Sequence, residues 1–150
     1  GPNGVAIIVE VITDNKNRTV AELRHIFSKF GGSLGESGSV SWVFEKKGQI
    51  TILDNALGFD SLFDISLNAG AEDINEIEQG FVITTRFGSL KEVKRLLEGQ
   101  GCRISCAEYK MIPKVIQKVQ RAESEASLNL ISGLKNNDDV NKIYSNLEVE

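Results

Sequence analysis

The stretch VAIIVEVITDNKNRTVAELRHIFSKFGG, residues 5–32, sets the pattern of the fold. Residues 5–13 are rich in β-branched side chains and apolar on both faces, which is typical of a central strand. Residues 19–22 match a capping box, with Thr19 as the expected N-cap and Glu22 reaching back to it. Apolar residues then recur at helical spacing up to Phe30, and Gly31 follows as a left-handed C-cap. The stretch therefore predicts a strand followed by a helix.

The rest of the chain continues this alternation of strands and helices. Residues 40–45 alternate between apolar and polar side chains, which predicts a half-buried strand with Trp42 and Phe44 facing the core. Residues 46–49 (KKGQ) predict a hairpin turn into a strand at 50–53. The periodicity also predicts further helices at 59–69, from 90 to 97 and at 123–135, and further strands at 74–78, 81–85, 102–109 and 140–149.

Two groups of elements follow from this order. Residues 1–54 joined to 120–150 read β-α-β-β-α-β, the order of a ferredoxin-like unit. Residues 55–119 read α-β-β-α-β and are expected to form a second, small α+β domain inserted into the first. The predicted fold class is therefore α+β, and strands 5–13 and 140–149 should lie in one sheet.

The glycine-rich loop GGSLGESGS, residues 31–39, raises the question of a nucleotide site. A phosphate cradle lies between a strand and the N-terminus of the next helix. This loop instead follows a helix and leads into a predicted strand, and it lacks the ending of a P-loop. Two interpretations remain, a flexible connector and a tight loop whose glycines take positive φ.

The residues that could carry chemistry do not assemble into a recognisable catalytic pattern. His25 is the only histidine and falls on the polar side of the first helix. Cys102 and Cys106 would be about 13 Å apart on a strand, too far for a disulfide, so both are expected to be free core thiols. Four carboxylates at 72, 73, 76 and 78 are typical of a solvated strand or loop. We therefore expect no enzyme, no metal, no cofactor and no small-molecule substrate; the longest apolar run, 5–12, is too short for a membrane span.

With no catalytic pattern in the sequence, the distribution of charge makes a binding surface the remaining candidate for a functional site. The net charge is −4, but residues 1–54 carry six basic and six acidic groups. All six basic groups fall on two local elements, the first helix with its preceding turn and the predicted hairpin. They could be ordinary solvated charges or contacts to a phosphate-rich partner. The candidate nucleic-acid or ribosome contacts are Lys16, Arg18, Arg24, Lys29, Lys46 and Lys47.

Six segments of the sequence are distinctive: TDNKNRT (13–19), FSKFGGSLG (27–35), GSVSWVFEKKG (38–48), AGAED (69–73), YKMIP (109–113) and DDV (138–140). Together they closely resemble the YebC/PmpR family, which includes the mitochondrial translational activator of cytochrome c oxidase subunit I. The resemblance implies a basic helical N-terminal domain followed by two α+β domains, one inserted in the other. This chain is expected to lack the first. The glycine-rich loop is similar to the helix-to-strand loop of that family.

The resemblance implies a non-enzymatic regulator of gene expression. Family members are described either as DNA-binding transcriptional regulators or as factors that act in translation, at the ribosome or on mRNA. The implied partners are rRNA, mRNA or DNA, and the ribosome; a protein-interaction module remains a further alternative. We expect a monomer in the bacterial cytoplasm, or in the mitochondrial matrix if the source is a eukaryote.

Overall fold

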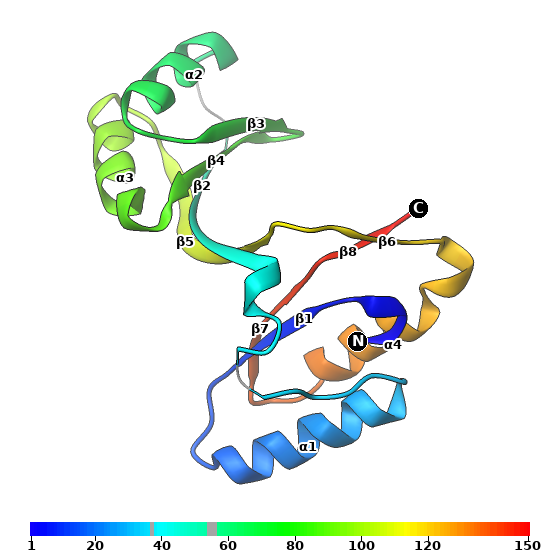
Figure 1. The fold of residues 1–150 in the computed structure, drawn as a ribbon. Coiled ribbons are helices and arrows are strands. Elements are labelled where there is room, and N and C mark those ends of the chain that lie inside the picture. The colour runs from blue at the N-terminus through cyan, green and yellow to red at the C-terminus, as the bar shows by residue number, and fades with distance from the viewer. Residues whose placement is uncertain (37, 54–56) are drawn as a thin grey trace. The chain divides into compact units, whose positions relative to one another are not determined.

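A computed structural model describes residues 1–36, 38–53 and 57–150 (Figure 1). The chain divides into two units, the first made of residues 1–45 and 113–150 and the second of residues 46–112. The predicted boundaries were 54/55 and 119/120, later along the chain in both cases. Ser37 of the glycine-rich loop and residues 54–56, where the first predicted boundary falls, lie outside the described residues.

The first unit joins the two ends of the chain. Strand β1 (Ile7–Val11) pairs antiparallel with β7 (Val140–Ser145), with Ile7 opposite Ser145 and Val11 opposite Val140. The prediction that the two end strands share a sheet is therefore confirmed. Helices α1 (Lys16–Lys29) and α4 (Glu125–Lys135) pack on each other, and the short strands β6 (Gln117–Val119) and β8 (Leu147–Val149) pair in parallel. The core contains Val5, Ile7, Leu23, Phe27, Val119, Leu130 and Leu134.

The start of α1 differs from the prediction. The helix begins at Lys16, and the Asn15 side chain accepts a hydrogen bond from the Arg18 backbone N–H at 3.1 Å. Thr19, the expected N-cap, is instead fully buried inside the helix, and its hydroxyl donates to Asp139 at 2.7 Å. The hydrogen bond to Asp139, near the other end of the chain, satisfies the Thr19 hydroxyl inside the protein. At the other end of the helix the prediction holds, since Gly31 has the left-handed φ of 81°.

Residues 40–53 contain one strand, not two. Ser41–Val43 is a single 3-10 turn (η2), and β2 runs without a hairpin from Phe44 to Leu53. Trp42 lies in the turn, outside the alternation of the strand, and is 69% exposed, so the prediction that it is buried is wrong. Strand β2 pairs with β4. It therefore contributes to the sheet of the second unit and leaves β1 paired with β7 in a separate sheet.

The second unit is a four-stranded sheet with two helices on one face (Figure 1). Its strand order is β3 (Asp73–Ile77), β4 (Gly80–Arg86), β2 and β5 (Ile104–Pro113). Alternate residues of β2 and β4 point toward α2 (Phe59–Asn68) and α3 (Leu90–Gly99), and the core includes Ile50, Ile52, Leu62, Ile83, Val93 and Leu97. Both units thus mix helices with sheet, and the α+β fold class is confirmed.

The structure also bears on the two cysteines and on the possibility of a membrane-spanning helix. Both cysteines are free, but only Cys102 is buried; Cys106 is exposed on β5, so it is not a core thiol. None of the helices in the described part of the chain is long and apolar enough to cross a bilayer.

Candidate nucleic-acid interface

Helix α1 is the most basic element among those predicted to bind a partner. It carries four of the six candidate cations and a single carboxylate, Glu22. Its buried residues Thr19, Leu23 and Phe27 face the core, and the amphipathic pattern leaves Arg24, His25 and Lys29 exposed. The apolar stripe that builds the helix therefore also determines which of its charges reach solvent.

Arg18 is held by carboxylates of its own unit. Its guanidinium lies 3.3 Å from Asp14, 3.9 Å from Glu22 and 3.4 Å from Asp139. The hydrogen bond from Thr19 and the contact with Arg18 lower the pKa of Asp139, and the bond to Asp139 raises the pKa of Arg18. This arrangement ties the start of α1 to the turn before β7. It also offsets the Arg18 charge, so Arg18 has a structural role whether or not it contacts a partner.

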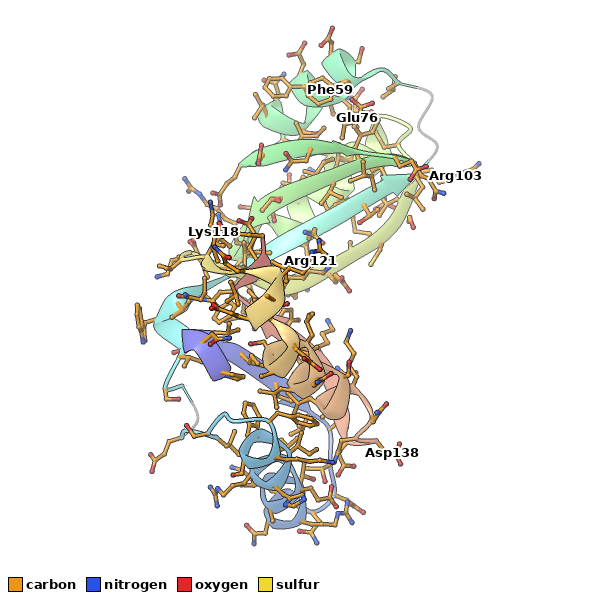
Figure 2. All side chains as sticks on the ribbon, turned by 90° about the vertical axis from the view of Figure 1, so that its right-hand side faces the viewer. Phe59, Glu76, Arg103, Lys118, Arg121 and Asp138 are labelled. Carbon is orange, nitrogen blue, oxygen red and sulfur yellow. The ribbon has the colours of Figure 1, made fainter. Side chains whose placement is uncertain are left out.

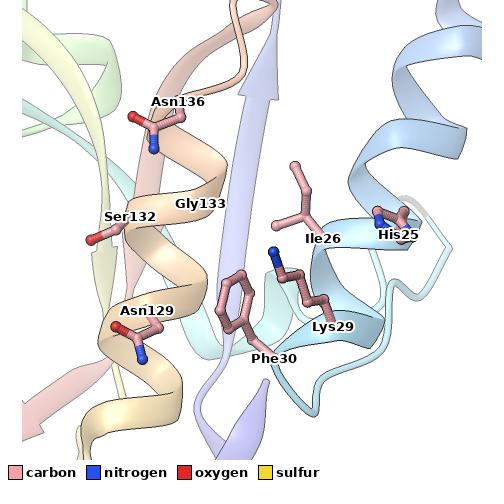
Figure 3. Close-up of a pocket in the computed structure, with 8 residues that line it drawn as sticks. All are labelled: His25, Ile26, Lys29, Phe30, Asn129, Ser132, Gly133 and Asn136. Atoms are coloured by element: carbon pink, nitrogen blue, oxygen red, sulfur yellow. The ribbon is translucent and has the colours of Figure 1, made fainter.

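Lys29 borders an open groove of about 410 Å³ between α1 and α4 (Figure 3). The Lys29 ammonium lies 5.5 Å from the centre of the Phe30 ring. Gly133 lets the helices approach closely, because a Cβ there would lie 3.0 Å from Phe30 Cε2. The groove contains no carboxylate and is lined by His25, Ile26, Lys29, Phe30, Asn129, Ser132, Gly133 and Asn136.

Lys46 and Lys47 are neighbours on β2, so their side chains leave opposite faces of the sheet. Lys47 is 19% exposed and its ammonium donates to Glu72 at 3.1 Å. Lys46 is exposed, and its ammonium lies 4.8 Å from the centre of the Phe87 ring and 5.9 Å from that of Tyr109. The predicted hairpin tip is therefore a strand segment in which one lysine is ion-paired and the other lies over aromatic rings.

The six candidates thus differ in how much free charge they offer. Arg18 and Lys47 are ion-paired, whereas Lys16, Arg24, Lys29 and Lys46 form no ion pair with any described residue. Four candidates, Lys16, Arg18, Arg24 and Lys29, belong to the first unit, and Lys46 and Lys47 belong to the second.

Sequence reasoning missed the aromatic neighbours of these lysines and one further cation, Arg86. Arg86 lies opposite Lys47 in the pairing of β2 with β4, and it is exposed. Arg86 could have been added to the candidates only if the pairing of β2 with β4 had been known. The local sequence contains no signal for this pairing, because the partner lies about 40 residues away.

Candidate metal ligands do not gather in one place in the described part of the chain. Within residues 1–36, 38–53 and 57–150, no three His, Cys, Asp or Glu side chains are placed to hold a metal ion. Members of the acidic cluster have structural partners instead: Glu72 pairs with Lys47, and Asp73 accepts from the Ile74 backbone N–H at 2.9 Å.

Comparison with known proteins places the chain in a family. The family described as "TACO1/YebC second and third domain" matches residues 1–147. The chain belongs to the TACO1/YebC family. This agrees with the resemblance seen in the sequence, and the match to the second and third domains agrees with the two α+β units.

Relatives of this chain are named as regulators rather than enzymes. A "Probable transcriptional regulatory protein" of Syntrophus aciditrophicus is 46% identical over 149 residues, which is 99% of this chain and 60% of the relative. One of the same name from Pelotomaculum thermopropionicum is 43% identical over 152 residues, 100% of this chain and 63% of the relative. These names agree with the prediction of a non-enzymatic regulator of gene expression. The chain spans about 60% of the length of these relatives.

A solved structure supports the fold. The crystal structure of a conserved hypothetical protein, Aq1575, from Aquifex aeolicus superposes with a TM-score of 0.86 at 36% identity. The match covers 99% of this chain and 62% of the Aquifex chain.

Proposed function

We propose that this chain regulates translation by contacting RNA, as mRNA or as rRNA of the ribosome, without performing chemistry. One observation carries the proposal: two of the candidate lysines that have free charge lie beside aromatic rings. Lys29 is 5.5 Å from the centre of Phe30, and Lys46 is 4.8 Å from the centre of Phe87. Cations beside aromatic rings suit single-stranded nucleic acid, because the cation contacts phosphate and the ring stacks on an unpaired base.

The charge balance favours RNA loops over duplex DNA as the target. Binding to a duplex grows with the number of Lys and Arg contacts to phosphate, and this chain has a net charge of −4. Stacking on unpaired bases adds affinity that does not depend on many cations. The second candidate is a DNA-binding transcriptional regulator, and the names of the two relatives favour it.

The proposal also covers the partners, the oligomeric state and the location of the protein. Its partners are RNA and the ribosome, with no small-molecule substrate. We propose a monomer in the cytoplasm of a bacterium, or in the mitochondrial matrix if the source is a eukaryote. The contacts on the first unit are Lys16, Arg24 and Lys29.

Crosslinking of the protein in cells, followed by sequencing of the bound nucleic acid, tests the proposal. Recovery of rRNA and mRNA is the expected result, whereas recovery of promoter DNA would favour the transcriptional alternative. Recovery of proteins with no nucleic acid would favour a protein-interaction module and overturn the proposal.

A paired set of charge reversals tests the contacts on α1. Arg24→Glu with Lys29→Glu should reduce the RNA crosslinks and lower the salt slope of RNA binding by about 2, one for each lost phosphate contact. The control is Lys94→Glu with Arg103→Glu, which makes the same change of charge at two exposed positions of the second unit. Arg103 is labelled in Figure 2. If both double variants lost the same amount of binding, net charge alone would explain the effect and the α1 contacts would be wrong.

A further inference from the structure

We propose that Phe87 and Tyr109, together with Lys46, form a site for one unpaired nucleotide of RNA. The inference rests on the proposed function and assigns a specific subsite in the second unit to it. The base would stack on Phe87, and the Lys46 ammonium would contact a flanking phosphate.

The pairing of β2 with β4 brings these residues together. Lys47 is opposite Arg86, so Lys46 and Phe87 are the next residues along at the same end of the sheet. The Phe87 and Tyr109 rings are 4.8 Å apart between centroids and inclined at 45°, with the Lys46 ammonium 4.8 Å from the Phe87 centroid. Two aromatic rings and one cation therefore converge on one small surface, whereas Arg86, opposite Lys47, lies on the other face of the sheet.

Phe87 is more exposed than a purely structural role requires. It is 48% exposed, although the core of this unit lies next to it and buries Leu90 of the same segment. Tyr109 packs against the edge of that core and holds the Phe87 ring from one side. The ring is thus fixed in position while part of its surface remains available for stacking.

The Lys46 ammonium beside the rings is available to a ligand. Lys46 forms no ion pair with any residue that the structure describes, whereas the neighbouring Lys47 is bound to Glu72. The Lys46 ammonium lies over the ring, where an exposed cation–π contact is weak enough to be exchanged for a phosphate. A base stacking on Phe87 would take the place of this ammonium on the ring and leave it beside the backbone of the same nucleotide.

The second unit contains another exposed aromatic pair that provides a comparison. The Phe59 and Phe63 ring centroids are 5.7 Å apart, and each residue is 38% exposed. Phe59 is labelled in Figure 2. Their helix, α2, also carries Asp60 and Asp64 and no basic residue. Negative charge would repel a phosphate backbone there, so charge complementarity selects the Phe87 pair over the Phe59 pair.

Fluorescence of 2-aminopurine in a short single-stranded RNA reports stacking directly, because the fluorescence of this base is quenched when it stacks. The 150-residue chain should quench the probe, and Phe87→Leu should remove the quenching and weaken binding about fivefold to hundredfold. Phe63→Leu makes the same substitution at the acidic pair and should leave both unchanged. Lys46→Gln should weaken binding and lower the salt slope by about 1. Circular dichroism would establish that each variant is folded.

The possible outcomes separate this site from the function on which it rests. If RNA binds through α1 but Phe87→Leu behaves like Phe63→Leu, the stacking site is wrong and the proposed function stands. If Phe87→Leu proves unfolded, Lys46→Gln decides alone, and unchanged affinity and salt slope would overturn the site. If the unaltered chain binds no RNA, both the site and the RNA-binding function are overturned.

Discussion

Replacing Asn146 by alanine should destabilise the first unit more than the small number of deleted side-chain atoms suggests. Asn146 is 4% exposed and lies between β7 and β8. Its side chain accepts from the Ala6 backbone N–H at 2.8 Å and donates to the Val115 carbonyl at 3.0 Å. One side chain thus links the strand at the start of the chain to the segment that re-enters the first unit.

The magnitude follows from what Asn146→Ala leaves behind. The buried Ala6 N–H loses its side-chain partner, which costs about 1–3 kcal/mol. The Val115 carbonyl belongs to a residue that is 52% exposed, so water can replace most of that bond. We therefore expect a loss of about 2–3 kcal/mol in the free energy of unfolding.

Urea denaturation followed by circular dichroism measures this loss, and hydrogen exchange of the Ala6 amide locates it. The matched control is Asn141→Ala, which removes an exposed hydrogen bond to Glu10 in the same pair of strands and should cost less than about 0.5 kcal/mol. If Asn146→Ala cost no more than Asn141→Ala, and the Ala6 amide stayed protected, the reasoning would be refuted.

Three further predictions concern single side chains. Trp42→Ala should cost less than about 1 kcal/mol in urea denaturation, because the ring is 69% exposed; a loss above about 3 kcal/mol would mean that it packs in a core. The pKa of Asp139 is lowered in the folded state, so its ionised form adds stability above the unfolded value of about 3.9, and this stability is lost as the pH falls through the lower folded pKa. Asp139→Asn should therefore be less stable at pH 7 and flatten the acid dependence of unfolding; an unchanged acid dependence would contradict the assignment. Cys106 should react with iodoacetamide faster than Cys102, because Cys102 is buried and burial raises its pKa; equal labelling by mass spectrometry would argue against this difference.

The sequence by itself determined the elements whose signals are local. The apolar stripe of α1 and the glycine that ends it depend on residues within a few turns of one another, and Gly31 takes the predicted left-handed φ. The order of elements, taken together with the family resemblance, placed β1 and β7 in one sheet. The family resemblance came from contiguous motifs that need no tertiary information.

Only the tertiary structure decided how these elements use their polar and aromatic residues. Thr19 reads as an N-cap until Asp139 is placed beside it, more than a hundred residues later in the chain. The alternation at 40–45 looked like a strand facing a core, yet Trp42 lies in a turn, and the lysines that looked like a hairpin continue β2.

The candidate interface shows the same division. The positions of six cations were visible in the sequence, but their free charge was not. Arg18 meets Asp139, Lys47 meets Glu72, and Lys46 lies over Phe87, each partner at least 25 residues away. Periodicity reports the conformation of neighbouring residues, whereas charge and exposure depend on which distant strands pair, and that pairing is fixed only when the sheets form.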